Sequence, residues 1–165
     1  MITFEEAVAT LDDDGRKLAT ELHTRALDIG YIPFVDRAGK KEGNYKIEYK
    51  ADKNAYVLFI SRISKGALCL GCKLLHLGEY TQLICGLREV VRDELLKSRR
   101  CKVDEGCTAF IKFEYEGTEY LTCRHAMRLK TLAYCDAESF WELLAAEASH
   151  RNVVLRSLKL RQERA

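Results

Sequence analysis

Three cysteines and one histidine in the second half of the chain have the ligand types of a zinc site. They are spaced C-x5-C-x15-C-x-H, as Cys101, Cys107, Cys123 and His125. Zinc favours about four sulfur and nitrogen ligands in a tetrahedron. Residues two apart on a strand share a face, so Cys123 and His125 can point the same way. A two-residue hairpin turn, however, pairs Cys123 with Phe110 rather than with Cys107, and buried cysteines also serve as small core residues. Our alternative functional hypothesis is therefore a zinc-binding or thiol-dependent protein that uses these four residues, with zinc as the possible cofactor.

A second cysteine pair, Cys69 and Cys72, has the C-x-x-C spacing of zinc knuckles and thiol oxidoreductases. This segment has the pattern of a strand, and residues three apart on a regular strand point to opposite faces. No helix is predicted to begin at Leu70, so the pair also lacks the helix N-terminus that lowers the pKa of a redox thiol. We therefore expect the two thiols to lie on different faces of a sheet.

Aromatic residues on two predicted strands suggest a binding pocket for a small molecule. Tyr45, Tyr49 and Tyr56 lie on adjacent strands, with Arg62 on the face of Tyr56. Aromatic walls with one cation suit a ligand that has an apolar body and an acid group. The alternative is an ordinary sheet face whose tyrosine hydroxyls reach solvent, because aromatic residues are common in strands.

Recognisable catalytic sets are scarce in this sequence. The four histidines form no H-E-x-x-H pattern, and no serine lies in G-x-S-x-G. Cys123 and His125 are the nearest possible nucleophile and base, and only their proximity in the sequence singles them out. We therefore predict no catalytic residues and favour a non-enzymatic protein.

The elements that must position these residues alternate between helices and groups of strands. A capping box at Thr3 and Glu6 begins a short helix, and no Gly-rich nucleotide-binding motif is present. The expected order is α-βββ-α-ββ-α, which favours an α+β fold with an antiparallel sheet of about five strands, a three-stranded meander plus a hairpin, packed against helices. The order is similar to that of several small bacterial ligand-binding and uncharacterised domains, without a motif that indicates a family. The predicted segments are a helix over Gly15–Asp28, strands over Tyr45–Tyr49, Ala55–Ile63 and Ala67–Leu75, a long helix containing Leu83–Leu95, a hairpin of Thr108–Tyr115 and Thr118–Thr122, and a helix over Ala137–Ala148.

The end of the chain differs in charge from the rest. Residues 150–165 contain five basic residues and one acid, which leaves 22 basic and 24 acidic residues in positions 1–149. We predict one α+β domain over residues 1–149 and a basic helical tail over 150–165, after a break near His150. Val154, Leu155 and Leu158 form an apolar stripe in this tail. The tail can dock on another subunit, touch an anionic surface, or simply pack as a solvated helix.

Composition restricts the class of protein and its partners. The chain has 165 residues, 47% hydrophobic and 32% charged, with a net charge of +2, which describes one globular domain. A larger positive excess is usual for proteins that bind duplex DNA, so we do not expect nucleic acid as a partner. Seven cysteines without a recognisable signal peptide indicate the reducing cytoplasm, and no apolar run is long enough for a membrane span. The leading hypothesis is a cytoplasmic, non-enzymatic domain that binds a small molecule or a protein partner and can form a homo-oligomer.

Overall fold

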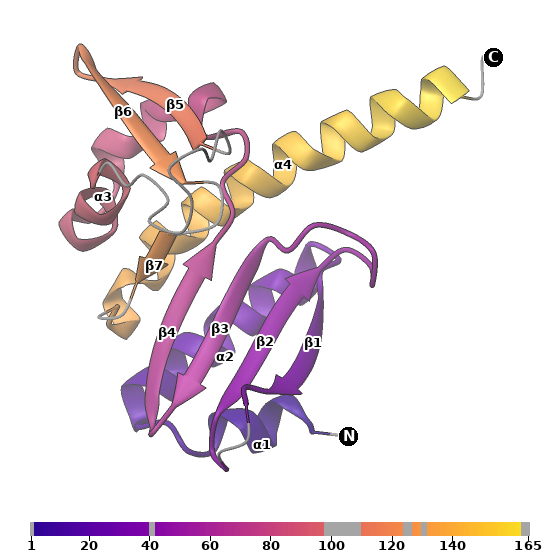
Figure 1. The fold of residues 1–165 in the computed structure, drawn as a ribbon, viewed down its shortest axis with the longest axis vertical. Coiled ribbons are helices and arrows are strands. Elements are labelled where there is room, and N and C mark those ends of the chain that lie inside the picture. Colours follow the sequence, from indigo (N-terminus) through magenta and orange to yellow (C-terminus); the bar gives the residue numbers. More distant parts are fainter. Residues whose placement is uncertain (1, 40–41, 98–109, 124–126, 130–131, 163–165) are drawn as a thin grey trace.

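The computed structural model describes residues 2–39, 42–97, 110–123, 127–129 and 132–162. They form the predicted α+β fold, in which an antiparallel sheet has helices packed against it (Figure 1). The sheet has five strands in the order β1-β2-β3-β4-β7, and β5 and β6 form a separate two-stranded hairpin. The helices are α1 Phe4–Val8, α2 Asp13–Asp28, α3 Glu89–Leu96 and α4 Ala137–Gln162, with short 3-10 helices η1 Leu77–Glu79, η2 Thr81–Gly86 and η3 Tyr134–Asp136. The strands are β1 Ile32–Arg37, β2 Tyr45–Lys50, β3 Phe59–Ser64, β4 Ala67–Cys72, β5 Phe110–Tyr115, β6 Thr118–Cys123 and β7 Met127–Leu129.

The first two helices begin at capped residues and cover one face of the sheet. The Thr3 hydroxyl accepts from the backbone of Glu6, whose carboxylate accepts from the backbone of Thr3, so the predicted capping box is present. Asp12 caps α2 by accepting from the Gly15 main-chain N–H at 2.7 Å. The buried side of α2 carries residues at helical spacing, Leu18, Ala19, Leu22 and Ala26. Both helices lie behind β1–β4 in Figure 1.

Strand register assigns side chains to the two sheet faces. On β2, Ile47 and Tyr49 are buried towards the helices, whereas Lys46, Glu48 and Lys50 alternate with them on the other face. The β3–β4 pairing continues this alternation, with Phe59 opposite Cys72. The residues that fill the space between sheet and helices therefore come from every second position of each strand.

Helix α4 extends further than the predicted Ala137–Ala148 segment. It continues without the expected break near His150 as far as Gln162, because Glu147 and Arg151 form an i,i+4 ion pair across that point. The end of α4 extends past the other elements in Figure 1. None of the helices in the described ranges is both long and apolar enough to cross a membrane.

Two further predictions of local structure are wrong. The long helix expected around Leu83–Leu95 is instead the 3-10 helix η2 followed by α3, because Leu87 adopts an extended backbone conformation between them. The segment beginning at Ile32, which we did not predict as a strand, is the edge strand β1, where Pro33 is tolerated. The predicted hairpin is confirmed, but it forms its own sheet rather than extending the main one.

Candidate functional site

A buried carboxylate on α4, Glu147, is the centre of a polar cluster where the sheet meets the second half of the chain. The Glu147 side chain is completely buried. Its Oε1 accepts from the Arg151 Nε at 2.8 Å and from the His76 Nδ1 at 3.0 Å. Its Oε2 accepts from the Tyr80 hydroxyl at 2.8 Å and from the His76 main-chain N–H at 3.0 Å. Four donors therefore saturate one carboxylate, which is how a buried charge is stabilised.

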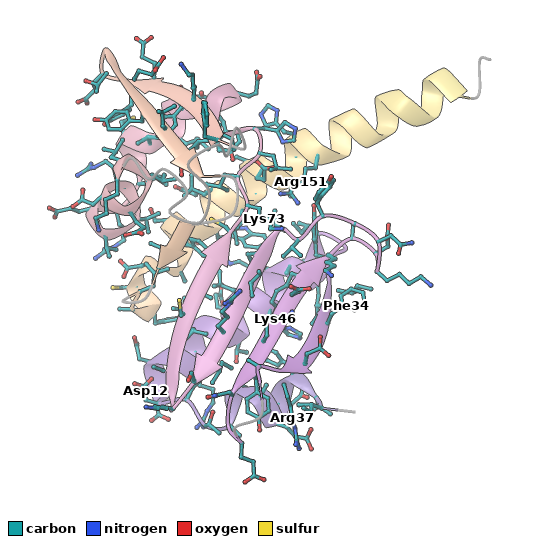
Figure 2. The ribbon with its side chains drawn as sticks, viewed as in Figure 1. Asp12, Phe34, Arg37, Lys46, Lys73 and Arg151 are labelled. Carbon is teal, nitrogen blue, oxygen red and sulfur yellow. The ribbon has the colours of Figure 1, made fainter. Side chains whose placement is uncertain are left out.

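Arg151 connects this carboxylate to two loops at the end of the sheet. Its guanidinium donates to the carbonyl oxygens of Tyr56 at 3.3 Å, Val57 at 3.1 Å and Lys73 at 2.6 Å. Figure 2 shows Arg151 on α4 close to Lys73, which follows β4. One forked cation therefore fixes α4, the loop before β3 and the chain after β4 relative to one another.

The electrostatics of the cluster favour charge on Glu147 and neutrality on its neighbours. Burial alone raises the pKa of Glu147, but hydrogen bonds from Arg151, the His76 main chain and Tyr80 outweigh it and hold that pKa below its usual value. Burial, and then the Glu147 charge, raise the pKa of the nearby Cys72 thiol and of the Tyr80 hydroxyl. A thiol held protonated in this way is a poor nucleophile.

Two imidazole rings lie at the outer side of this cluster. The His76 ring centre is 6.0 Å from that of His150, and the planes differ by 16°. The Tyr80 ring centre is 5.5 Å from that of His150, and the two planes differ by 33°. The His76 side chain is 30% exposed, so the cluster is buried at Glu147 and reaches solvent at the histidines.

Four exposed apolar side chains lie on the segments at the end of the sheet that Arg151 binds, namely the end of α2, the beginning of β1 and the loop before β3, and we call them the apolar end surface. Tyr56 is 74% exposed, and the other three are 39–45% exposed. Ile32 pairs with Lys50, the residue before the loop that carries Tyr56, so β1 begins where this loop begins. The members of the surface are Leu27, Ile29, Ile32 and Tyr56.

The structure places the four predicted ligand-binding residues on different sides of the sheet. Tyr49 is fully buried on the helix-covered face, where its ring stacks on Phe59 and its hydroxyl lies 3.1 Å from the His23 Nδ1. Tyr45 is half-buried and packs against the core next to it. Arg62 is exposed and pairs with Lys46, whose side chain alternates to the opposite face. Tyr56 lies in the loop before β3, not on a strand.

The C-x-x-C thiols lie apart, as the strand pattern predicts. Cys69 pairs with the exposed Arg62, whereas Cys72 is buried and pairs with Phe59. They therefore point to opposite faces of β4 and cannot serve one site.

The predicted zinc residues lie almost entirely outside the described residues. Cys101, Cys107 and His125 are not described, and Cys123 is described only as the last residue of β6, where it pairs with Phe110 as the hairpin prediction required. Among the described residues, no group of three or more histidine, cysteine or acidic side chains is arranged to hold a metal ion. The zinc set remains a prediction.

Sequence reasoning did not identify the Glu147 cluster, although the sequence contains a signal for it. Phe140, Leu143 and Leu144 recur at helical spacing and are buried, and Glu147 and Arg151 continue the same stripe. Two opposite charges at i,i+4 within an apolar stripe indicate a buried ion pair. The partners His76 and Tyr80 carried no such signal, because they meet α4 only in the folded chain.

Comparisons of this chain with known proteins add no relative. No family model, curated protein or solved structure matches it.

Proposed function

We propose that this chain is a non-enzymatic interaction domain that binds a protein partner through the apolar end surface, and that the partner is a second copy of the chain. The observation that carries the proposal is the gathering of Leu27, Ile29, Ile32 and Tyr56 at one end of the sheet. Exposed apolar side chains grouped in this way mark interaction sites. Arg151 binds the carbonyl oxygens of Tyr56 and Val57, so the loop that carries Tyr56 is held in place before a partner binds.

The exposure of these residues favours a protein partner over a small molecule. Small ligands are usually bound in concave sites that surround most of their surface. Two surface hollows, of about 380 and 480 Å³, are lined by other residues, the first by Asp13–Glu21 side chains with Tyr134 and the second by η2 and α4. A protruding tyrosine with aliphatic neighbours is instead the usual centre of a protein–protein contact.

The direction of α4 favours a second copy as this partner. The helix leaves the body just after Arg151, beside the apolar end surface, and its end extends past the other elements (Figure 1). Residues 152–162 continue α4 beyond Arg151, and helices in proteins gain most of their stability from packing an amphipathic face. The sequence of this segment combines apolar residues at helical spacing with a basic excess, while residues 1–149 have an acidic excess. Two copies that exchange these segments bury the apolar residues and place each basic segment against the acidic part of the other copy, in one symmetric interface.

Light scattering after size-exclusion chromatography, over a range of protein concentrations, tests this proposal. We expect a dimer for the unchanged chain and a shift to monomer for Tyr56→Asp and for Ile29→Asp. Tyr134→Asp is the matched control, because Tyr134 is also an exposed tyrosine but contacts the beginning of α2 rather than its end.

Either of two results overturns the proposal. One is a monomer for the unchanged chain at every concentration. The other is a dimer that Tyr56→Asp and Ile29→Asp weaken no more than Tyr134→Asp does. Circular dichroism of each variant shows whether it is folded, so a loss of dimer through unfolding is recognised.

A further inference from the structure

The outer edge of β1 is a second place where another copy of the chain could bind, and Pro33 lies on it. We infer that Pro33 closes this edge to a second strand, so that Pro33 determines which surface of the molecule takes part in self-association. The edge is distinct from the apolar end surface, although β1 begins at Ile32, a member of that surface. The inference does not depend on the proposed dimer.

Strand β1 has the regular backbone that allows edge-to-edge pairing. It is the first strand in the sheet order, so one side of its backbone faces β2 and the other side borders the sheet (Figure 1). Its residues pair with β2 in one continuous register, from Ile32 opposite Lys50 to Arg37 opposite Tyr45. An edge strand of this kind presents a row of unpaired N–H and C=O groups, which is a template for pairing with another chain.

The direction of each main-chain group in β1 follows from one hydrogen bond just beyond its end. The Ala38 N–H donates to the Asn44 carbonyl oxygen at 2.8 Å, and these two residues continue the β1–β2 register. In an antiparallel pair, residues that make such bonds alternate with residues whose N–H and C=O point away from the partner strand. Every second residue back from Ala38 therefore bonds to β2. The residues between them direct their main-chain groups to the open edge, and they are Pro33, Val35 and Arg37.

Pro33 therefore lies at an outward position of the edge. Proline has no N–H, so the donors that β1 presents outward are those of Val35 and Arg37. A strand added to this edge would make β1 a central strand, where proline is rarely found because it cannot donate to the ladder. Proline on an edge strand is one of the features by which natural sheets avoid pairing with another chain.

A second copy of the chain is the partner that this edge would otherwise take, because two β1 strands can pair antiparallel about a two-fold axis. With the axis at Val35, the two Val35 residues would bond to each other, and the Arg37 N–H of each copy would donate to the Pro33 carbonyl oxygen of the other. The reciprocal bond, from the nitrogen of residue 33 to the Arg37 carbonyl oxygen, is the one that proline removes. Pro33 therefore disrupts this symmetric pairing at both ends.

The position of the Pro33 side chain allows a substitution that changes little else. Pro33 is opposite the buried Tyr49 and is itself half-buried, so its side chain lies on the helix-covered face of the sheet. Valine is apolar, similar in size and favoured in strands. Pro33→Val therefore restores a donor at the open edge while the side chain keeps its apolar surroundings.

Light scattering after size-exclusion chromatography, over the same range of concentrations for each variant, tests this inference. At the highest concentration we expect Pro33→Val to have at least twice the average molar mass of the unchanged chain, whether the unchanged chain is a monomer or a dimer. Pro33→Ala also restores the donor and should assemble too. In Pro33→Val/Val35→Pro the molar mass should return to that of the unchanged chain, because proline then removes the next outward donor.

The single variants Val35→Pro and Phe34→Pro test the direction of the main-chain groups. The Phe34 N–H points to β2, so Phe34→Pro removes a bond of the sheet, whereas Val35→Pro removes an outward donor. We expect the midpoint of urea unfolding to fall much further for Phe34→Pro than for Val35→Pro. Equal decreases would contradict the assignment of the outward positions.

Two results of the light scattering overturn the inference. One is an unchanged molar mass for Pro33→Val and Pro33→Ala at every concentration. The other is a larger assembly that persists in the double variant, because such an assembly does not form through the edge of β1. Circular dichroism shows whether each variant is folded, so aggregates of unfolded chains are recognised. A monomeric unchanged chain whose Pro33→Val variant assembles would overturn the proposed dimer and support this inference.

Discussion

The Arg151 side chain shows how one residue can join several parts of the chain. It bonds to Glu147 and to the carbonyl oxygens of Tyr56, Val57 and Lys73. If Arg151 is replaced by methionine, the buried Glu147 loses its only bonded cation among the described residues, and the carbonyls lose a donor. Breaking a buried ion pair in this way costs about 3–5 kcal/mol. We therefore expect the free energy of unfolding in urea, followed by Trp141 fluorescence, to fall by that amount.

A surface ion pair provides the control for this prediction. Arg25 binds Glu21 and Glu138 at 2.7 and 2.6 Å, but the Glu138 side chain is 63% exposed. Exposed pairs contribute about 0–1 kcal/mol, so Arg25→Met should change stability little. Equal losses in the two variants would show that the Arg151 cluster does not hold the fold together.

Single residues also show where prediction from the sequence ends. The sequence alone was sufficient to assign the thiols of Cys69 and Cys72 to opposite faces of a strand, because this assignment depends only on strand periodicity. The predicted face shared by Tyr56 and Arg62 could not be established in the same way. It required β3 to include Tyr56, whereas β3 begins at Phe59. Strand ends depend on loop packing, here on the bonds from Arg151, which the periodic pattern does not contain.

At the level of elements, the glycine turns joining β3 to β4 and β5 to β6 are nearly equivalent in backbone conformation. Gly66 and Gly117 have φ values of 77° and 74° and follow Lys65 and Glu116, which also have positive φ. Such turns match the twist of a hairpin. Their surroundings differ, because a Cβ at Gly66 would lie 3.2 Å from the Thr10 carbonyl oxygen, whereas one at Gly117 would have nothing within 4 Å.

This difference predicts unequal effects of alanine. Gly117→Ala should lower the free energy of unfolding by about 1–2 kcal/mol, through backbone strain alone. Gly66→Ala should lower it further, because the methyl group must also displace the chain between α1 and α2. Urea unfolding of both variants measures the difference. If Gly66→Ala lowers the free energy of unfolding no more than Gly117→Ala does, the segment between α1 and α2 can move to admit the methyl group without loss of stability.

Whole elements were predictable where a pattern is long and local. Helix α2 and the β5–β6 hairpin lie close to their predicted ranges, because helical spacing and a Glu-Gly turn are sufficient signals. The predicted helix around Leu83–Leu95 has an apolar 3.6-residue period, yet the chain turns at Leu87 and packs as η2 and α3. An apolar period shows that residues are buried, and tertiary packing then decides between one helix and two shorter ones.

For the whole molecule, acid pH should reduce stability in two stages, and the first comes from His23. Burial lowers the pKa of His23 below 6.5 in the folded chain, while the Glu5 charge raises it only in part. The unfolded chain therefore binds more protons than the folded chain once the pH falls below about 6.5, so stability decreases from that pH downwards. His23→Gln retains a polar partner for Tyr49 but does not titrate, so its stability should stay constant where that of the unchanged chain begins to fall.

The second stage comes from Glu147, whose folded pKa lies below the ordinary value of 4.5. Its contribution is complete above pH 4.5 and is lost as the pH falls through the lower, folded value, because the unfolded carboxyl takes up its proton first. The paired carboxylates of Glu48 and Glu138 have lowered pKa values too and add to this stage. Urea unfolding at a series of pH values from 8 to 3 should therefore show two declines in the free energy of unfolding. The first is absent in His23→Gln, and the second, at lower pH, is present in both His23→Gln and the unchanged chain. Protonating Glu147 weakens the bonds that hold α4 to the end of the sheet, so the proposed dimer should dissociate over the same pH range as the later decline in stability. If a dimer forms and persists below that range, the apolar end surface does not depend on the Arg151 cluster.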